Sequence, residues 1–456
     1  RTRARRSARR EPEPLAASAR GAMDAIVETI TKLSNGETES LQTLARQLRS
    51  MESQLFRHAL HLDSALTGLA APLHTVGLVF LLSVRASALA QANTPPALEF
   101  LQQCRALLLD ADPAQLKLVP SEASQLCSKF LGFALQAGAP MLAVAPLLAA
   151  ARALQPTEQD FTPMHPMALQ AAILARNYAA VEPLCDALLV RVTPAATAVT
   201  PHDVLLTHYY AGIALVGLRR HGAAMAAFQL VLAAPTHVLN RVMTCAYKKW
   251  LLCGLVAKGR APSLAKYTAP VVARSVRALA KPYTDLAQAF GGEDRAKLQA
   301  VAAQHAAVYA EDGNSGLVKR ALATHAKQAI EGLARTYVTL PLAHIARTAG
   351  LPTEAEAEAL LVQMVDRGEI CARIDRTNGM ASFSDEAGGP GEGHMKAALD
   401  ERLAALGAMA GKLKALHEEM AGDAHYVYKT TDKGPEARGA GRFAGEQGAL
   451  EDMAIA

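Results

Sequence analysis

The sequence predicts a mostly α-helical protein in which a tetratricopeptide-like array of helical repeats is followed by a winged helix and a C-terminal bundle helix. Aromatic residues make up only 5% and charged residues 20% of the 456 residues, and alanine and leucine are abundant. This composition favours packed helices over sheets. Between residues 369 and 383 the apolar residues change from a helical period to a period of two, as expected for a β-hairpin.

The first 22 residues (1–22) are predicted to be disordered and to carry the net charge of the chain. Residues 1–20 contain seven arginines and two glutamates, so they account for the whole formal charge of +5 and leave the remainder neutral. A neutral body has no overall basic field that would attract nucleic acid. Met23 would make a natural initiator, and we expect the folded protein to begin there.

N-terminal helical repeats are expected over residues 23–205. Residues 177–184 resemble residues 221–228, which is typical of helix-hairpin repeats of about 40 residues. The longest apolar run, residues 75–84, is much shorter than the roughly 20 residues that span a bilayer. The sequence therefore predicts no membrane segment.

The best candidate repeat is residues 209–235. Gly212, Ala224 and Phe228 occupy the small, small and large positions of a tetratricopeptide-like unit, where two helices can cross closely because one side chain is missing. An ordinary helix hairpin with small residues placed by chance is the alternative in a chain so rich in alanine. Phe228 is expected to lie between the paired helices.

Residues 206–384 are predicted to form one domain, with a helical part at 206–335 and a winged helix at 336–384. In the winged helix, Gly350 ends a first short helix and Thr353 caps a second. Alternating residues from 369 to 374 then form one strand, and Asn378-Gly379 supplies the positive φ angles of a hairpin turn. The order helix, turn, helix, hairpin is that of a winged helix.

The C-terminal region is predicted to contain a flexible linker (385–393), a bundle helix (394–422) and a disordered tail (423–456). Gly407 and Gly411 each cost about 1 kcal/mol in an isolated helix, so this helix is expected to need a partner. The alternative is a helix that folds back on its own repeats. Its apolar positions follow steps of four and three, the seam of a helical bundle: Leu399, Leu403, Leu406, Ala410, Leu413, His417 and Met420.

No catalytic, cofactor-binding or metal-binding residues are predicted. The chain has no phosphate-binding glycine loop, no nucleophile-elbow motif and no zinc-protease motif, and its histidines are scattered. The six cysteines form no CxxC pair and mostly occupy apolar helical segments, so reduced, buried thiols in a cytosolic or nuclear protein are expected. The sequence therefore favours a protein that is not an enzyme.

Nucleic-acid binding through the winged helix is an alternative from another functional class. The helix that would meet DNA carries Glu354, Glu356, Glu358 and Asp366 against Arg367 alone. These carboxylates would repel phosphate at the surface that should approach it. We therefore expect no nucleic-acid partner.

The chain resembles the PCI-domain family, in which helical repeats lead into a winged helix. Within this family it is similar to the third-subunit family of the COP-nine signalosome, over about residues 23–420. The strings that carry the resemblance are Ala246–Trp250, Lys258-Gly259, Lys266–Thr268, Asp312–Lys319, Gly368–Ile374 and Asn378–Phe383. The paralogous PCI subunit of the proteasome regulatory lid is the alternative within the same family.

The resemblance implies a non-catalytic scaffold subunit without cofactors, present in cytoplasm and nucleus. Its implied partners are other PCI and metalloprotease-like subunits of a complex that removes a ubiquitin-like modifier from cullin-RING ubiquitin ligases. Contact with these ligases would be indirect. The implied protein interfaces are the first wing strand and the bundle helix, with the residues Ile370, Ala372, Arg373, Ile374, Leu399, Leu403, Leu406, Leu413 and Met420.

Overall fold

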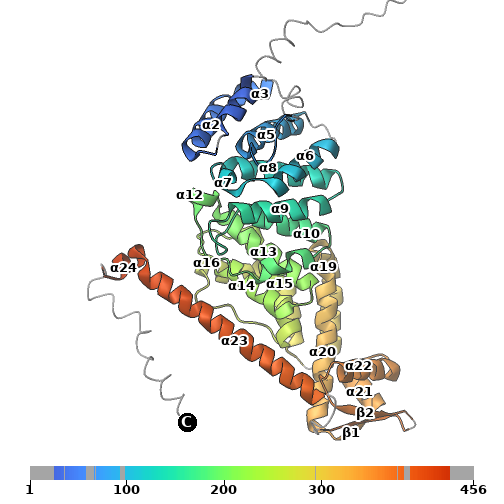
Figure 1. Cartoon of the computed structure of the whole chain (residues 1–456). Coiled ribbons are helices and arrows are strands. Elements are labelled where there is room, and N and C mark those ends of the chain that lie inside the picture. Colours follow the sequence, from blue (N-terminus) through green and yellow to red (C-terminus); the bar gives the residue numbers. More distant parts are fainter. Residues whose placement is uncertain are drawn as a thin grey trace, which may run out of the picture. The chain divides into compact units, whose positions relative to one another are not determined.

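The protein is described by a computed structural model that covers residues 25–34, 36–57, 66, 68–92, 98–292, 294–376, 378–384 and 391–431 (Figure 1). The predicted disordered start (1–22) lies outside these residues. The chain divides into two compact units, Arg1–Ala329 and Ile330–Ala456, and the division falls within helix α20 (Ser315–Thr336). We describe each unit by itself.

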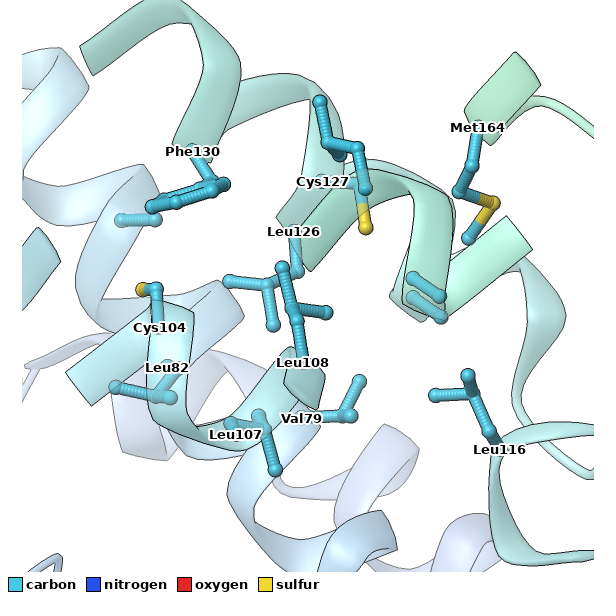
Figure 2. Close-up of a cluster of buried hydrophobic side chains, with 14 of the residues drawn as sticks. Val79, Leu82, Cys104, Leu107, Leu108, Leu116, Leu126, Cys127, Phe130 and Met164 are labelled. Atoms are coloured by element: carbon cyan, nitrogen blue, oxygen red, sulfur yellow. The ribbon is translucent and has the colours of Figure 1, made fainter. Parts of the chain in front are cut away.

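The first unit is a stack of helices that pack in sequential pairs (Figure 1). Helix α5 is buried on nearly every side and contains the longest apolar run, so this run serves the core. Figure 2 shows Val79, Leu108, Leu126 and Phe130 converging on one apolar centre. The helices of this part are α2 (Thr38–Ser50), α3 (Glu52–Arg57), α5 (Thr75–Gln91), α6 (Leu98–Asp110), α7 (Pro113–Leu116), α8 (Pro120–Gln136), α9 (Met141–Leu154) and α10 (Met164–Leu174).

The stack continues through a second core cluster. Thr200 begins helix α13 with a capping box, in which its side chain and that of Asp203 satisfy each other's backbone N–H groups. The elements here are η2 (Ala179–Val181), α11 (Glu182–Asp186), α12 (Pro194–Thr197), α13 (Pro201–Gly217), α14 (His221–Ala233), α15 (Arg241–Lys258), α16 (Pro270–Leu279), α17 (Lys281–Phe290), α18 (Arg295–Gln304), α19 (Ala306–Glu311) and α20.

The predicted repeat at residues 209–235 is a packed helix pair, α13 with α14. Phe228 is completely buried, and a Cβ atom placed on Gly212 would lie 2.5 Å from its ring. The close crossing of these helices therefore depends on the missing side chain, which confirms the prediction made for Gly212 and Phe228.

The second unit begins with the predicted winged helix. A three-stranded antiparallel sheet has the strand order β1-β3-β2, and Leu361, Met364 and Phe383 belong to the small core that it shares with two helices. The elements are β1 (Thr339–Pro341), α21 (Leu342–Thr348), α22 (Glu354–Asp366), β2 (Ala372–Asp375) and β3 (Met380–Phe383). The prediction omitted β1, which is three residues long and ends at a proline.

The turn chemistry of the winged helix agrees with the sequence prediction. The Thr353 hydroxyl accepts a hydrogen bond from the backbone N–H of Glu356 at 3.2 Å, as an N-cap should. Gly350 and Gly379 have φ angles of 62° and 63°, a region that residues with a Cβ atom enter at a cost. Gly350 therefore ends its helix as predicted, and of the predicted turn pair Asn378-Gly379 the positive φ angle is found at Gly379.

The C-terminal helices correct two predicted boundaries. Helix α23 spans Gly391–Gly422, so it begins three residues before the predicted position 394. Of the predicted linker, residues 385–390 lie outside the described residues. Helix α24 (Ala424–Thr431) occupies the start of the predicted disordered tail and follows α23 after Asp423 alone. Tyr426, Val427 and Tyr428 make this segment more apolar than a disordered tail usually is. Residues 432–456 lie outside the described residues.

The cysteines differ in their exposure. Cys104, Cys127 and Cys253 are buried, Cys185 and Cys245 are half-buried, and all six thiols are free. Burial raises the pKa of Cys127 to about 12, which keeps this thiol protonated and inert. Cys371, next to strand β2, is exposed and departs from the expected burial.

Candidate assembly interface

The outer strand of the winged-helix sheet presents its backbone to solvent. Strand β2 pairs with β3 on one side, and no strand within the described residues pairs with its other side. The backbone N–H of Ser384 donates to the carbonyl of Cys371 at 3.1 Å, so the polar groups of Cys371 face β3. Because these groups alternate along an antiparallel strand, those of Arg373 also face β3, whereas those of Ala372 and Ile374 face outward.

The opposite edge of the sheet offers fewer hydrogen-bonding groups. Backbone bonds from Phe383 to Val338 at 2.7 Å and from Leu342 to Gly379 at 2.8 Å show which groups of β1 face β3. By the same alternation, Thr339 and Pro341 face outward. Since proline has no N–H, this short strand is blocked against further pairing. The β2 edge is therefore the better site for an added strand.

The side chains of the predicted wing residues do not point to a partner. Ile370, Ala372 and Ile374 are half-buried against the winged-helix core, and only Arg373 is exposed. These residues were predicted to lie in an interface, and the structure places them on the outer strand of the sheet or directly before it. An edge of this kind can recruit a strand from another protein through backbone hydrogen bonds.

Helix α23 exposes the predicted bundle residues. None of them belongs to a core cluster, and among its described side chains only Leu416 is half-buried. Such a row of large apolar side chains is unusual on the surface of a protein. The exposed fractions lie between 53% and 63% for the five residues Leu399, Leu403, Leu406, Leu413 and Met420.

The second helix of the winged helix presents acidic groups to solvent. Glu354 and Glu356 are exposed in the first turn of α22. Arg376 of the wing forms an ion pair with Glu358, which reduces the positive charge that this wing could offer to phosphate. This surface is therefore poorly suited to the usual winged-helix contact with DNA.

A partly buried polar network joins helix α15, helix α17 and the turn before α20. Asp312 accepts hydrogen bonds from the ammonium group of Lys248 at 2.8 Å and from the Tyr283 hydroxyl at 2.7 Å. Asn314 donates to the same Tyr283 oxygen at 2.8 Å and accepts from Lys249. We call these five residues the α15–α20 network.

The charges of the α15–α20 network stabilise one another. Burial alone would raise the pKa of Asp312, but the hydrogen bonds from Lys248 and Tyr283 and the nearby lysine charges outweigh it and lower the pKa. Burial lowers the pKa of Lys249. The two sequence strings that meet here, Ala246–Trp250 and Asp312–Lys319, both carry the family resemblance, but their contact was not predicted. The sequence feature that could have indicated this contact is the pair of adjacent lysines, Lys248 and Lys249, within an otherwise apolar stretch of α15.

The described residues contain neither a candidate metal site nor a membrane-spanning helix. No group of three or more histidine, cysteine, aspartate or glutamate side chains among them is arranged to hold a metal ion. None of the described helices combines the length and hydrophobicity needed to cross a membrane.

A helical-repeat array that leads into a winged helix with an open strand edge defines a PCI-type protein. The family model of the PCI domain matches residues 302–385. The family model described as COP9 signalosome complex subunit 3, N-terminal helical repeats, matches residues 38–272, which is more than half of the chain. The chain therefore belongs to the COP9 signalosome subunit 3 family.

Two relatives agree with this assignment over most of their length. The COP9 signalosome complex subunit 3 of Dictyostelium discoideum is 29% identical over 390 residues, which cover 84% of this chain and 91% of the relative. The protein of the same description from Arabidopsis thaliana is 28% identical over 417 residues, which cover 90% of this chain and 94% of the relative.

Proposed function

We propose that this chain is a non-catalytic scaffold subunit of the COP9 signalosome and supports removal of a ubiquitin-like modifier from cullin-RING ubiquitin ligases. Its direct partners are other PCI and metalloprotease-like subunits, and its contact with the ligases is indirect. We further propose that it acts in the cytoplasm and the nucleus. The isopeptidase chemistry belongs to another subunit in this proposal.

The observation that carries the proposal is the outward-facing backbone of β2. Ala372 and Ile374 each direct an N–H and a carbonyl group away from the sheet, and a neighbouring subunit would satisfy these groups by adding a strand. The exposed apolar row of α23 supplies a second contact, because a helix with this surface gains stability by joining a bundle.

A matched pair of proline substitutions tests the strand contact. Ala372→Pro removes an N–H that faces outward, whereas Arg373→Pro removes an N–H that bonds to β3. Each variant is co-expressed with the other signalosome subunits, and its yield in the purified complex is compared with its melting temperature alone. We expect Ala372→Pro to melt near the wild type and to assemble poorly, and Arg373→Pro to lower the melting temperature.

Normal assembly of the Ala372→Pro variant would contradict the role of the β2 edge. Deletion of residues 385–456 tests the helix contact separately, because it leaves the winged-helix core intact. We expect the shortened chain to fold and to enter the complex at reduced yield. Modifier cleavage by the purified chain alone would contradict the non-catalytic assignment.

A further inference from the structure

A pocket of about 350 Å³ lies among the helices of the first unit. Helix α9, the loop after it, His165 of α10 and the segment from η2 to the loop after α11 surround it. Leu148, Leu184 and Leu189 contribute apolar walls, while Gln155 and Arg152 contribute polar groups. The volume is at the lower end of the range of about 300–1,000 Å³ typical of ligand sites.

The loops around this pocket are fixed by a buried carboxylate. Asp160 is 1% exposed and accepts hydrogen bonds from the N–H and hydroxyl of Thr157 at 2.9 and 2.6 Å. It also accepts from the hydroxyl of Thr193 at 3.0 Å, and the backbone of Phe161 donates to Arg191 at 2.9 Å. These bonds tie the loop after α9 to the loop after α11, so the pocket is preformed.

His165 supplies the pocket with a hydrogen-bond donor. It is 1% exposed, and its Nδ1 accepts the backbone N–H of Thr162 at 3.0 Å. Burial lowers the pKa of His165 to about 4, so the ring is neutral at physiological pH. Because Nδ1 is the acceptor, the single ring proton resides on Nε2. No hydrogen bond from Nε2 to another described group is present, and because His165 lines the pocket, this donor is available to a ligand there.

Gln155 supplies a complementary acceptor. Its side-chain amide nitrogen donates to the backbone carbonyl of Asp160 at 2.9 Å, which orients the side chain and leaves its Oε1 as an acceptor. One neutral donor and one neutral acceptor match the carbonyl and N–H groups of a peptide. A carboxylate would meet Glu158 as well as Arg152, so the charged groups of the lining together do not compensate for the loss of its hydration.

We propose that this pocket binds an uncharged, leucine-sized residue of a partner protein, with its side chain against the apolar walls and an adjoining peptide group on His165 and Gln155. This inference goes beyond the scaffold function and does not depend on it. Arg152 and Glu158 at the pocket have opposite charges, which is consistent with a ligand without net charge.

The proposal can be tested with N-acetyl-leucinamide as the probe and the full chain as the protein. Histidine labelled with ¹³C at Cε1 gives one NMR signal for each of the 14 histidines, and loss of one signal in His165→Phe assigns His165. We expect the His165 signal to shift saturably, with half-saturation at about 1–10 mM for so small a ligand. The amides of N-acetyl-glycine and N-acetyl-aspartate should bind at least tenfold more weakly.

Substitutions inside and outside the pocket test whether the probe binds there. Ala187→Trp places a large ring at the pocket and should abolish the shift, whereas Ala195→Trp, an exposed position outside the lining, should leave it unchanged. His165→Phe keeps the volume and removes the donor, so it should weaken binding about fivefold in ligand-detected NMR. A missing shift in the wild type, binding that persists in Ala187→Trp, or equal binding of the acidic amide would each overturn the proposal.

Discussion

Replacement of Asp312 by alanine should strongly destabilise the joint between α15 and α20. The side chains of Asp312 and Lys248 are only 24% and 16% exposed, so the ammonium group that remains is poorly hydrated. The Tyr283 hydroxyl also loses its acceptor. A hydrogen bond to a charged group contributes about 1.5–3 kcal/mol, and the carboxylate accepts three, two from the one ammonium group of Lys248 and one from Tyr283. Allowing for partial hydration, we expect a loss of about 3 kcal/mol.

Urea unfolding followed by tryptophan fluorescence measures this loss directly. The chain has a single tryptophan, Trp250, which is buried in the same helix as Lys248. The matched control is Glu182→Ala, which breaks the ion pair with Arg220, where the side chains are 44% and 40% exposed. Such a pair contributes at most about 1 kcal/mol.

A double variant shows how much of this loss comes from leaving the Lys248 charge unpaired. Lys248→Met combined with Asp312→Leu removes both charges, so it should cost less than Asp312→Ala alone. A loss below about 1 kcal/mol for Asp312→Ala, or one no larger than that of Glu182→Ala, would show that the α15–α20 network does not stabilise the fold.

Three further predictions concern the core, the buried histidine and the last helix. Phe228→Ala should cost about 3–5 kcal/mol by leaving a cavity, and Gly212→Leu should be comparably harmful by overpacking; near-native melts of both variants by circular dichroism would show that the helices do not cross closely. His165 has a folded pKa of about 4 against 6.5 unfolded, so the unfolded state binds more protons between these values. Its contribution to stability is complete above pH 6.5 and decreases by up to about 3 kcal/mol as the pH falls to 4, and unfolding of His165→Gln should lack this dependence. Leu406→Asp with Leu413→Asp should leave the isolated chain folded and reduce its yield in the signalosome, as measured by co-purification; unfolding of the isolated variant would show that these residues serve its own core instead.

The features that depend on neighbouring residues were predictable from the sequence. The cap at Thr353 and the turn at Gly379 act within a few residues, so each has a local sequence signal. The close crossing at Gly212 was also predictable, because the repeat pattern pairs it with Phe228.

Features that depend on distant residues were not predictable. Lys248 and Asp312 are separated by 64 positions and follow no shared period, so only the folded chain brings them together. The outward groups of β2 depend on its register with β3, which alternation alone does not determine. Strand β1 is too short to show a period.

The unequal exposure of the cysteines favours chemical labelling of Cys371 over the buried thiols. Burial raises the pKa of Cys185 and Cys253 to about 12, so neither thiol ionises readily enough to attack a maleimide. Cys371 is exposed and precedes β2 directly. A fluorophore attached there would lie beside the open edge, and its emission would report the arrival of a neighbouring strand in real time.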